Sequence, residues 1–556
     1  MFKSRPLFLV VVTLCLLMAV IVSYWVALMP QRGLRNLKAD MLETSGLVLD
    51  AKRARLDIRN GFGVLLEDVT LSTSTTSTWQ LSAKSMALPG LMGGNVVLDQ
   101  AVLDVDVATV NAGALGFPNR ITLRDGILKM RDPARQAVVA VTDINGEISA
   151  VGAKGLQGKL AMVWGSQVSD LVFGIDDLER FAMTGSPMDL TLKSKAMLFG
   201  FSGQGRADNG FKLAGQATAD ATDIGSFFRW LGMSVQTLDG GGAVALQSGL
   251  ETTGLAMTFG TLKGDVGGTE LKGGVTVAAG ADRPKLSGNL NVVTLSLWGP
   301  KTDTSVLAQP WSEKPVPVSD FAAMDLDMTV TADQLKLRQR NWGAVTAQLK
   351  SSDGAMTMAM ADQKMAGGMG QINVILAKAG AYLKMQAQLD IRSASAQTLL
   401  GGLLGLDVID GAVNVTATLK ANGQSMAGMV STLEGPLKFS TQDAVLRKVD
   451  LLNAVSQPQK GWNPQDALRT EKMAFDFDTL LSEGVATLRS GLLRFNGVTL
   501  KPSGEIDTLR QAVAVQLAPS GKNTDANMLM SGTWLAPEFS AADSLKEKTA
   551  ITPPAN

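Results

Sequence analysis

Histidine is absent from the 556 residues, and cysteine occurs once, at Cys15. Without histidine the chain has no Ser-His-Asp or Cys-His catalytic group, no histidine-bearing metal site and no imidazole pH switch. A single cysteine excludes an intrachain disulfide, a zinc ribbon and a thiolate cluster. These absences remove the commonest catalytic and metal-binding chemistries before any sequence pattern is considered.

Charged and aromatic side chains are also scarce. Lys and Arg number 51, as do Asp and Glu, so the formal net charge is zero. Charged residues make up 18% of the chain and aromatic residues 5%, whereas about 25% charge is usual in soluble domains. A neutral chain lacks the basic surface that nucleic-acid binding requires, so we expect no nucleic-acid partner.

The usual catalytic motifs are missing too: the sequence contains no phosphate-binding GxxxxGK[ST] loop, GxSxG elbow or SxxK motif. Paired carboxylates occur at Glu67-Asp68 and Asp176-Asp177, but adjacent strand residues point to opposite faces and cannot act together on one bond. Asp104 and Asp106 share a face, as do the polar residues of every alternating segment. We therefore predict a protein that is not an enzyme, without catalytic residues, metal ligands or a cofactor.

One long apolar run begins near the N-terminus. Residues 7–29 contain no charge, and 23 helical residues span roughly 35 Å, enough to cross a hydrocarbon core of about 30 Å. A cleaved signal peptide normally has a shorter apolar core that ends in small residues. We therefore predict an uncleaved transmembrane anchor at residues 1–30, although basic residues on both sides leave its orientation open.

Beyond the anchor the dominant pattern has a period of two. In residues 382–391, YLKMQAQLDI, apolar and polar side chains alternate, as they do in residues 325–330 and 413–420. Such alternation is typical of strands with one apolar and one polar face. Glycine-containing dipeptides separate the segments and predict hairpin turns, at Asp125-Gly126, Asn145-Gly146, Asn209-Gly210, Asp239-Gly240 and Asp410-Gly411.

Four short segments have helical spacing instead. They are residues 32–44, 222–232, 394–405 and, more weakly, 449–455. Pro300, Pro310, Pro315 and Pro317 cluster between two β-rich halves and predict a linker. The expected organisation is an anchor at 1–30, a first β-rich half at 31–299, a proline-rich linker at 300–320, a second β-rich half at 321–540 and a disordered tail at 541–556.

The sequence thus predicts a mainly β protein, in which the N-terminal transmembrane helix is followed by an elongated, curled antiparallel sheet with a few short helices. Two interpretations of the apolar faces remain open: a closed core, or an open groove that holds acyl chains, for which methionine is an adaptable lining. The groove candidates are the apolar residues of the clearest strands, each of which could equally be a core residue: Met356, Met358, Met360, Leu383, Met385, Leu389, Val413, Val415 and Leu419.

Several segments in the same order resemble the AsmA family of Gram-negative envelope proteins. The apolar run leads into MLETSGLVLDAKRARLDIR, and GVLLEDVTLS and MALPGLMGGNVVLDQAVLDVD follow. Residues 224–240, 421–455, 497–519 and 532–540 resemble later parts of the family pattern. The resemblance implies an inner-membrane anchor with the bulk of the chain in the periplasm. It also implies a curled sheet similar in shape to chorein-type bridge proteins, whose apolar groove conducts phospholipid towards the outer membrane.

The functional hypothesis is therefore phospholipid transport for outer-membrane homeostasis, with phospholipid and the inner membrane as partners. About 36 strands spaced at about 4.8 Å give a sheet of roughly 170 Å, which two apposed layers would halve, so a periplasmic or outer-membrane partner protein is also expected. One alternative is an assembly factor that binds nascent outer-membrane proteins at a sheet edge. A minor alternative is a polysaccharide-binding β-solenoid.

Overall fold

A computed structural model describes residues 34–39, 41–43, 47–57, 63–73, 78–88, 95–110, 119–164, 167–231, 241–297, 311–317, 319–320, 323–338, 340–405, 409–446, 472–520, 527–534 and 536–541. The predicted anchor, the predicted helix at 449–455 and the predicted tail after Ala541 lie outside these residues. Among the residues described, no helix is sufficiently long and apolar to span a membrane.

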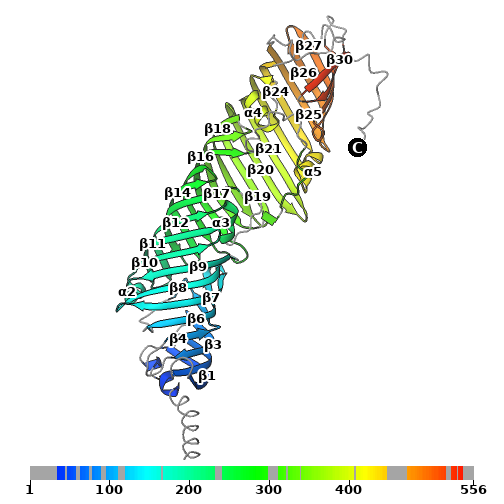
Figure 1. Cartoon of the computed structure of the whole chain (residues 1–556). Helices are drawn as coiled ribbons and strands as arrows, with labels where there is room; N and C mark the ends of the chain where they lie inside the picture. The colour runs from blue at the N-terminus through cyan, green and yellow to red at the C-terminus, as the bar shows by residue number, and fades with distance from the viewer. Residues whose placement is uncertain are drawn as a thin grey trace, which may run out of the picture. The chain divides into compact units, whose positions relative to one another are not determined.

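Strands dominate the described part of the chain, which contains thirty of them and only a few short helices (Figure 1). The prediction of a mainly β chain is confirmed. Contacts divide the chain into two compact units, Met1–Gly268 with Gly274–Lys285, and Thr269–Gly273 with Leu286–Asn556. Two strands lie at this division, β15(Thr269–Ala278) and β16(Lys285–Leu297).

Unit 1 is an antiparallel succession of strands with one parallel interruption. β1 pairs with β2 and β2 with β3, and from β6 to β14 each strand pairs with the next. β4 and β5 both lie between β3 and β6 and pair with β6 in parallel, which the prediction of a purely antiparallel sheet missed. The strands are β1(Leu47–Asp57), β2(Gly63–Thr73), β3(Trp79–Leu88), β4(Val96–Asp99), β5(Val102–Asp106), β6(Arg120–Asp132), β7(Ala137–Val151), β8(Gly155–Trp164), β9(Gln167–Ile175), β10(Ser186–Ser194), β11(Met197–Ala207), β12(Phe211–Ala221), β13(Val244–Thr253) and β14(Ala256–Val266).

Unit 2 repeats the same construction with antiparallel neighbours from β17 to β30, except that β23 follows β21 in the sheet and β22 pairs with the far end of β24. The strands are β17(Asp325–Leu337), β18(Arg340–Ser352), β19(Ala355–Met365), β20(Gly368–Ala379), β21(Tyr382–Ser395), β22(Ile409–Asp410), β23(Ala412–Gly423), β24(Gly435–Leu446), β25(Lys472–Ser482), β26(Val485–Phe495), β27(Val498–Asp507), β28(Ala512–Pro519), β29(Met528–Thr533) and β30(Ala536–Ala541).

Polar side chains at the N-terminal ends cap the short helices. Residues 34–39 and 41–43 are helical, and α3(Ile224–Trp230) and α4(Ala396–Leu403) lie where helical spacing predicted helices. Asp223 caps α3 by accepting from the Ser226 N–H, and Ser395 caps α4 in the same way. The sequence analysis missed η1(Pro133–Arg135), α2(Leu178–Met183) and α5(Met426–Ser431), because one or two turns are too short to establish a period.

The predicted turns fall into two groups. Asn209-Gly210 connects β11 to β12 as expected, with positive φ at both residues. The predictions at Asp125-Gly126 and Asn145-Gly146 were wrong, because these dipeptides lie inside β6 and β7 at shifts in register. The Asp125 N–H donates to the Asn145 side chain, which stabilises two adjacent bulges. A bulge bends a strand and increases its twist, so the same residue types here curve the sheet instead of ending a strand. Asp410-Gly411 connects β22 to β23, and Asp239-Gly240 lies outside the described residues.

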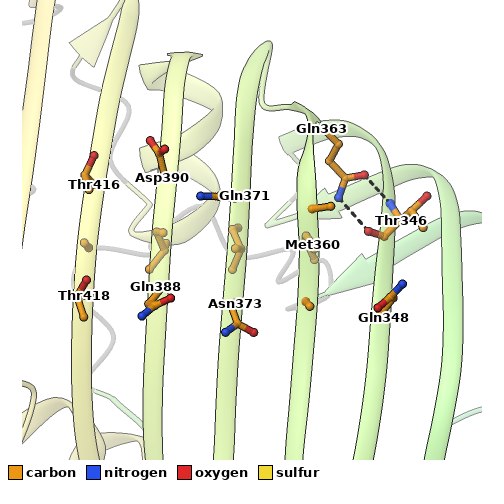
Figure 2. A pocket seen from close by; sticks show the side chains of 15 residues that line it. Thr346, Gln348, Met360, Gln363, Gln371, Asn373, Gln388, Asp390, Thr416 and Thr418 are labelled. Carbon is orange, nitrogen blue, oxygen red and sulfur yellow. Dashed lines mark hydrogen bonds between the residues drawn. The ribbon is translucent and has the colours of Figure 1, made fainter.

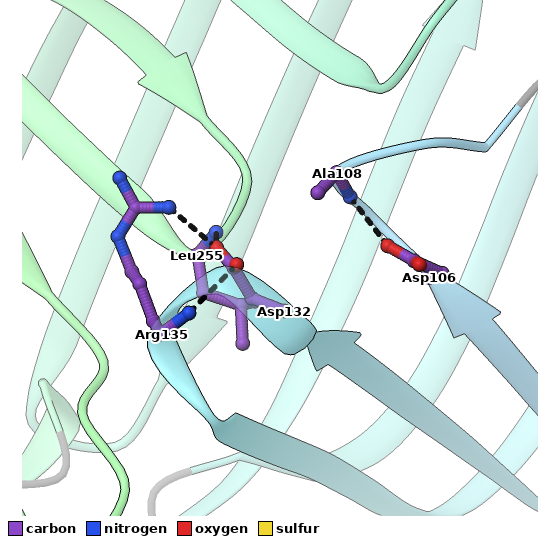
Figure 3. Close-up of polar contacts among 5 residues, drawn as sticks. All are labelled: Asp106, Ala108, Asp132, Arg135 and Leu255. Atoms are coloured by element: carbon purple, nitrogen blue, oxygen red, sulfur yellow. Dashed lines mark hydrogen bonds and ion pairs between the residues drawn. The ribbon is translucent and has the colours of Figure 1, made fainter.

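The sheet of unit 1 curls back on itself. β6 and β13 are seven pairings apart, which in a flat sheet would separate them by roughly 34 Å. Nevertheless the Asp132 carboxylate, at the end of β6, accepts from the Leu255 N–H between β13 and β14 at 3.0 Å (Figure 3). Asp132 is fully buried and also pairs with Arg135 at 2.5 Å. One side chain therefore joins two hairpins that are distant along the sheet.

The inner face of unit 1 is filled by large rings set against small residues. Phe199 and Trp230 have ring centroids 5.2 Å apart, and both belong to one buried cluster with Val141 and Leu250. Gly203, opposite Gly215 on β12, leaves room for the ring of Phe201. Large rings thus lie over glycines, which closes this part of the inner face into a packed core.

Replacing Asp132 with Asn tests the hairpin connection. Burial opposes ionisation of Asp132, but the Leu255 N–H and Arg135 outweigh it and hold the pKa of the carboxyl below its ordinary value. Because the folded pKa is lowered, the stabilisation is complete above the unfolded pKa of about 3.9 and is lost as pH falls through the folded value. We expect D132N to lower the free energy of unfolding by about 2 kcal/mol at pH 7 and by less at pH 3.

Urea unfolding followed by tryptophan fluorescence measures both values. D189N, which alters an exposed carboxylate on β10, is the matched control and should leave the unfolding free energy within about 0.5 kcal/mol. An equal loss at pH 7 and pH 3 would contradict an electrostatic role for Asp132.

Two glycines in neighbouring strands of unit 1 provide a second test. A Cβ at Gly203 would lie 2.4 Å from the Ala214 carbonyl oxygen and 2.5 Å from the Gly215 Cα, whereas a Cβ at Gly174 meets nothing within 4 Å. We expect G203A to lose about 1–3 kcal/mol of unfolding free energy because β11 and β12 must separate. G174A should not be destabilising. The same urea titration distinguishes them, and equal effects would show that backbone crowding at Gly203 is unimportant.

Candidate functional site

The nine predicted groove residues lie on one face of the sheet in unit 2. Residues opposite one another in an antiparallel register share a face, and Met358 lies opposite Val374, which lies opposite Ala387, which lies opposite Leu419. Parallel rows flank this one: Met356, Leu376, Met385 and Ala421; Met360, Ile372, Leu389 and Ala417; and Ile391 with Val415. We call these four rows the apolar face; Leu383 and Val413 extend it at opposite ends.

Burial divides the nine residues into two groups. Val413 and Leu383 are 0% and 2% exposed, so nothing outside the protein reaches them while their neighbours stay in place. The other seven are half-buried. Leu349 lies opposite Met358, and we call the row of Leu349, Met358, Val374, Ala387 and Leu419 the central row. Leu349 and Val374 are also half-buried, whereas Ala387 is buried. The centre of the apolar face is therefore partly accessible, whereas its two ends are covered.

One end of the apolar face is sealed by α4. Leu399 of α4, Trp342 and Val413 belong to one buried cluster, and the first two are 1% and 3% exposed. The helix lies so close to β18 that a Cβ at Gly402 would stand 2.5 Å from the Trp342 Nε1. This end is a packed core, and Met360, Leu389 and Val415 lie against it.

The other end is covered by α5 and by part of the predicted linker. Leu383, Ala421 and Met429 form a small buried cluster, against which Val316 packs together with Leu376, Met385 and Leu433. Val316 belongs to residues 311–317, which the sequence analysis assigned to a linker between halves. In the sequence Val316 is a single apolar residue between two prolines, and one such residue does not indicate packing.

Sequence reasoning also missed several residues of the apolar face. Ile372, Val374 and Leu376 lie in its rows, but the segment INVILA places Ile375 between them on the other face. That continuous apolar run hides the alternation of β20. The register with Met356, Met358 and Met360 is what assigns the three residues to the apolar face.

The opposite face is polar and carries ion pairs. Arg392 lies 2.8 Å from Asp362 and 4.0 Å from Asp390. The hydrogen bond to Asp362 and then the attraction of both carboxylates raise the pKa of Arg392, which stays charged in any case. The charge of Arg392 is therefore compensated by neighbouring carboxylates, and we interpret this face as a solvated surface.

A hollow of about 510 Å³ lies on the polar face where β18 and β19 separate. Gln363 uses its side-chain amide in place of a strand partner, since it accepts from the Thr346 N–H at 2.8 Å and donates to the Thr346 carbonyl at 2.9 Å (Figure 2). Gln348, Asn373 and Gln388 also line the hollow. Thr416, Thr418 and the Asp390 carboxylate line it as well, and Asp390 lies 4.0 Å from Arg392.

Most of the carboxylates considered in the sequence have structural partners. Asp104 pairs with Arg131, Glu67 lies 3.4 Å from Arg55, Asp106 accepts from the Ala108 N–H (Figure 3), and Asp177 caps α2. Within the described ranges no group of three or more acidic or cysteine side chains is arranged to hold a metal ion. The candidate site that we consider further is the apolar face.

A comparison with known protein families finds a match. The sequence model of the AsmA family matches residues 241–490, a range that begins just before β13 and includes all the strands of the apolar face. No curated protein matches the sequence significantly. This match agrees with the order of β-rich segments along the chain, and residues 241–490 are similar to the AsmA family.

Proposed function

We propose that this protein moves phospholipid between membranes by holding acyl chains on the apolar face of unit 2. The observation that carries the proposal is the central row, in which Leu349, Met358, Val374 and Leu419 are half-buried and Ala387 of β21, between Val374 and Leu419, is buried. No bond is made or broken, so the protein is not an enzyme. Residues 1–30 anchor it in the inner membrane, and the remainder lies in the periplasm.

The dimensions of the central row suit an acyl chain. From β18 to β23 the row crosses four strand spacings, roughly 19 Å. One leaflet of a bilayer holds its acyl chains within about 15 Å. A chain lying across the strands would therefore contact apolar side chains along its length, while the headgroup stays in water.

Methionine suits this site because the acyl chains that the site would hold are fluid. The thioether side chain is flexible and polarisable, so it adapts to acyl chains of different length and unsaturation. Three methionines of β19, Met356, Met358 and Met360, stand one above another across the rows of the apolar face. Leaving such side chains partly exposed costs hydrophobic free energy, which a bound acyl chain would recover.

A photoreactive amino acid at position 358 tests the proposal directly. We expect the full chain in cells to cross-link phospholipid at position 358 but not at position 357, because Thr357 points to the opposite face beside Lys350 and Ile375. Mass spectrometry of the cross-linked product identifies the lipid.

The same experiment addresses the alternative of an outer-membrane assembly factor. Capture of unfolded β-barrel precursors and no lipid would contradict lipid transport. Equal lipid capture at positions 357 and 358 would indicate only general contact with the membrane. Either result would overturn the proposal.

Charge introduced into the central row should block transport. We expect M358D to reduce phospholipid transfer between vesicles by about tenfold or more, because an ionised carboxylate in the row costs at least about 1.4 kcal/mol against a bound acyl chain. T357D is the matched control on the neighbouring residue and should transfer at the normal rate. A fluorescence dequenching assay measures both rates, and the result fails to support the proposal if M358D and T357D are equally active.

A further inference from the structure

The two ends of the apolar face differ in how firmly they are covered. At one end α4 contributes Leu399 to the large buried cluster. At the other end the cover includes residues 311–317, which we call the strap. Within the strap, Ser312 to Pro315 are exposed and only Trp311, Val316 and Pro317 are half-buried. The strap therefore buries little apolar surface of its own.

Between the strap and the other described residues, few hydrogen bonds are formed. The Val316 N–H donates to the Gln424 carbonyl at 2.7 Å, and the Ala427 N–H donates to the Ser312 carbonyl at 3.0 Å. Pro315 forms an isolated bridge with Ser425, and the Trp311 indole N–H donates to the Thr508 carbonyl at 2.9 Å. These contacts join the strap to the start of α5 and to the end of β27.

The prolines limit this attachment. Pro315 and Pro317 have no N–H, so of these three residues only Val316 can donate a backbone hydrogen bond. A regular strand has donors at successive residues, and proline within a sheet is confined to edge strands, strand ends or bulges. The strap therefore cannot become a regular strand of the sheet, and its release breaks far fewer interactions than the release of a strand would. Segments with few buried contacts open at the lowest free energy.

Beneath the strap lies one of the two covered ends of the apolar face. Val316 packs on the cluster of Leu383, Ala421 and Met429, beside Leu376 and Met385. Leu376, Met385 and Ala421 form one row of the apolar face. Removing the strap would join that cluster to the half-buried rows and lengthen the accessible apolar surface.

We propose that the strap is a releasable cover, and that an acyl chain enters or leaves the apolar face when the strap opens. This inference rests on the proposed function. Opening separates Val316 from Gln424 and Ser312 from Ala427, and it exposes Leu383 and Met385. The end beneath α4 stays shut, because Trp342 and Leu399 are packed there and the Trp342 ring lies too close to Gly402 for an added methyl group.

A reversible cross-link tests the strap. The hydrogen bond between Ser312 and Ala427 brings their backbones close enough for a disulfide, so we would combine S312C and A427C with C15S in the full chain. A phosphatidylethanolamine with a fluorescent group on one acyl chain reports uptake by the detergent-solubilised protein. We expect oxidation to slow uptake about tenfold and reduction to restore it, while C15S with S312C alone is unaffected by either treatment.

The outcomes separate the two proposals. Equal uptake by the oxidised and reduced forms would overturn the strap as a cover and leave lipid binding intact. If neither form takes up lipid and C15S alone takes up none, the proposed function is overturned and the strap inference with it.

A variant without new cysteines gives an independent measurement. W311F removes the indole hydrogen bond, so lipid uptake and hydrogen exchange at the Val316 N–H should both accelerate, while exchange near Leu399 should not change. Unchanged exchange and uptake in W311F would contradict the inference.

Discussion

The structure depends on the burial of one apolar face along a succession of antiparallel strands. Each strand of unit 2 from β18 to β21 contributes apolar side chains at alternate positions, and the register aligns them into rows. A flat sheet would leave that face in water at a cost of about 25 cal/mol for each Å². The chain has no long helices among its described residues to cover it, so bulges, short helices and curvature must do so.

The two units meet this constraint differently. In unit 1 the sheet curls until Asp132 of β6 bonds to Leu255 beyond β13, and aromatic rings fill the interior. In unit 2 the covers are local: α4 closes one end of the apolar face, and α5 with the strap closes the other. Between those covers the methionine-rich centre stays half-buried. A packed interior supports a fold, whereas a partly open one also leaves space for a ligand, and this contrast is why the proposed site lies in unit 2.

The polar face of unit 2 is stabilised by local ion pairs and by neutral polar side chains. Its carboxylates are paired with arginine or lysine or accept from backbone N–H groups, and its hollow is lined mainly by amides and hydroxyls. Gln363 even replaces a strand partner of Thr346 with its side chain. Neutral polar residues of this kind satisfy hydrogen bonds without attracting counter-charges, which is consistent with the low charge of the whole chain.

The sequence by itself determined the strands, their two faces and the positions of α3 and α4, because alternation and helical spacing are local properties of the chain. Within each strand it also placed the candidate residues on one side, since period two fixes the direction of each side chain, whereas the register between strands joined these sides into one face. Only the tertiary structure decided which of them are covered. Val413 and Val415 are separated by one residue and look equivalent in sequence, yet Val413 is 0% exposed beneath α4 while Val415 is half-buried. Likewise Asp125-Gly126 became a bulge and Val316 a cover, because register and packing are set by partners distant in the sequence.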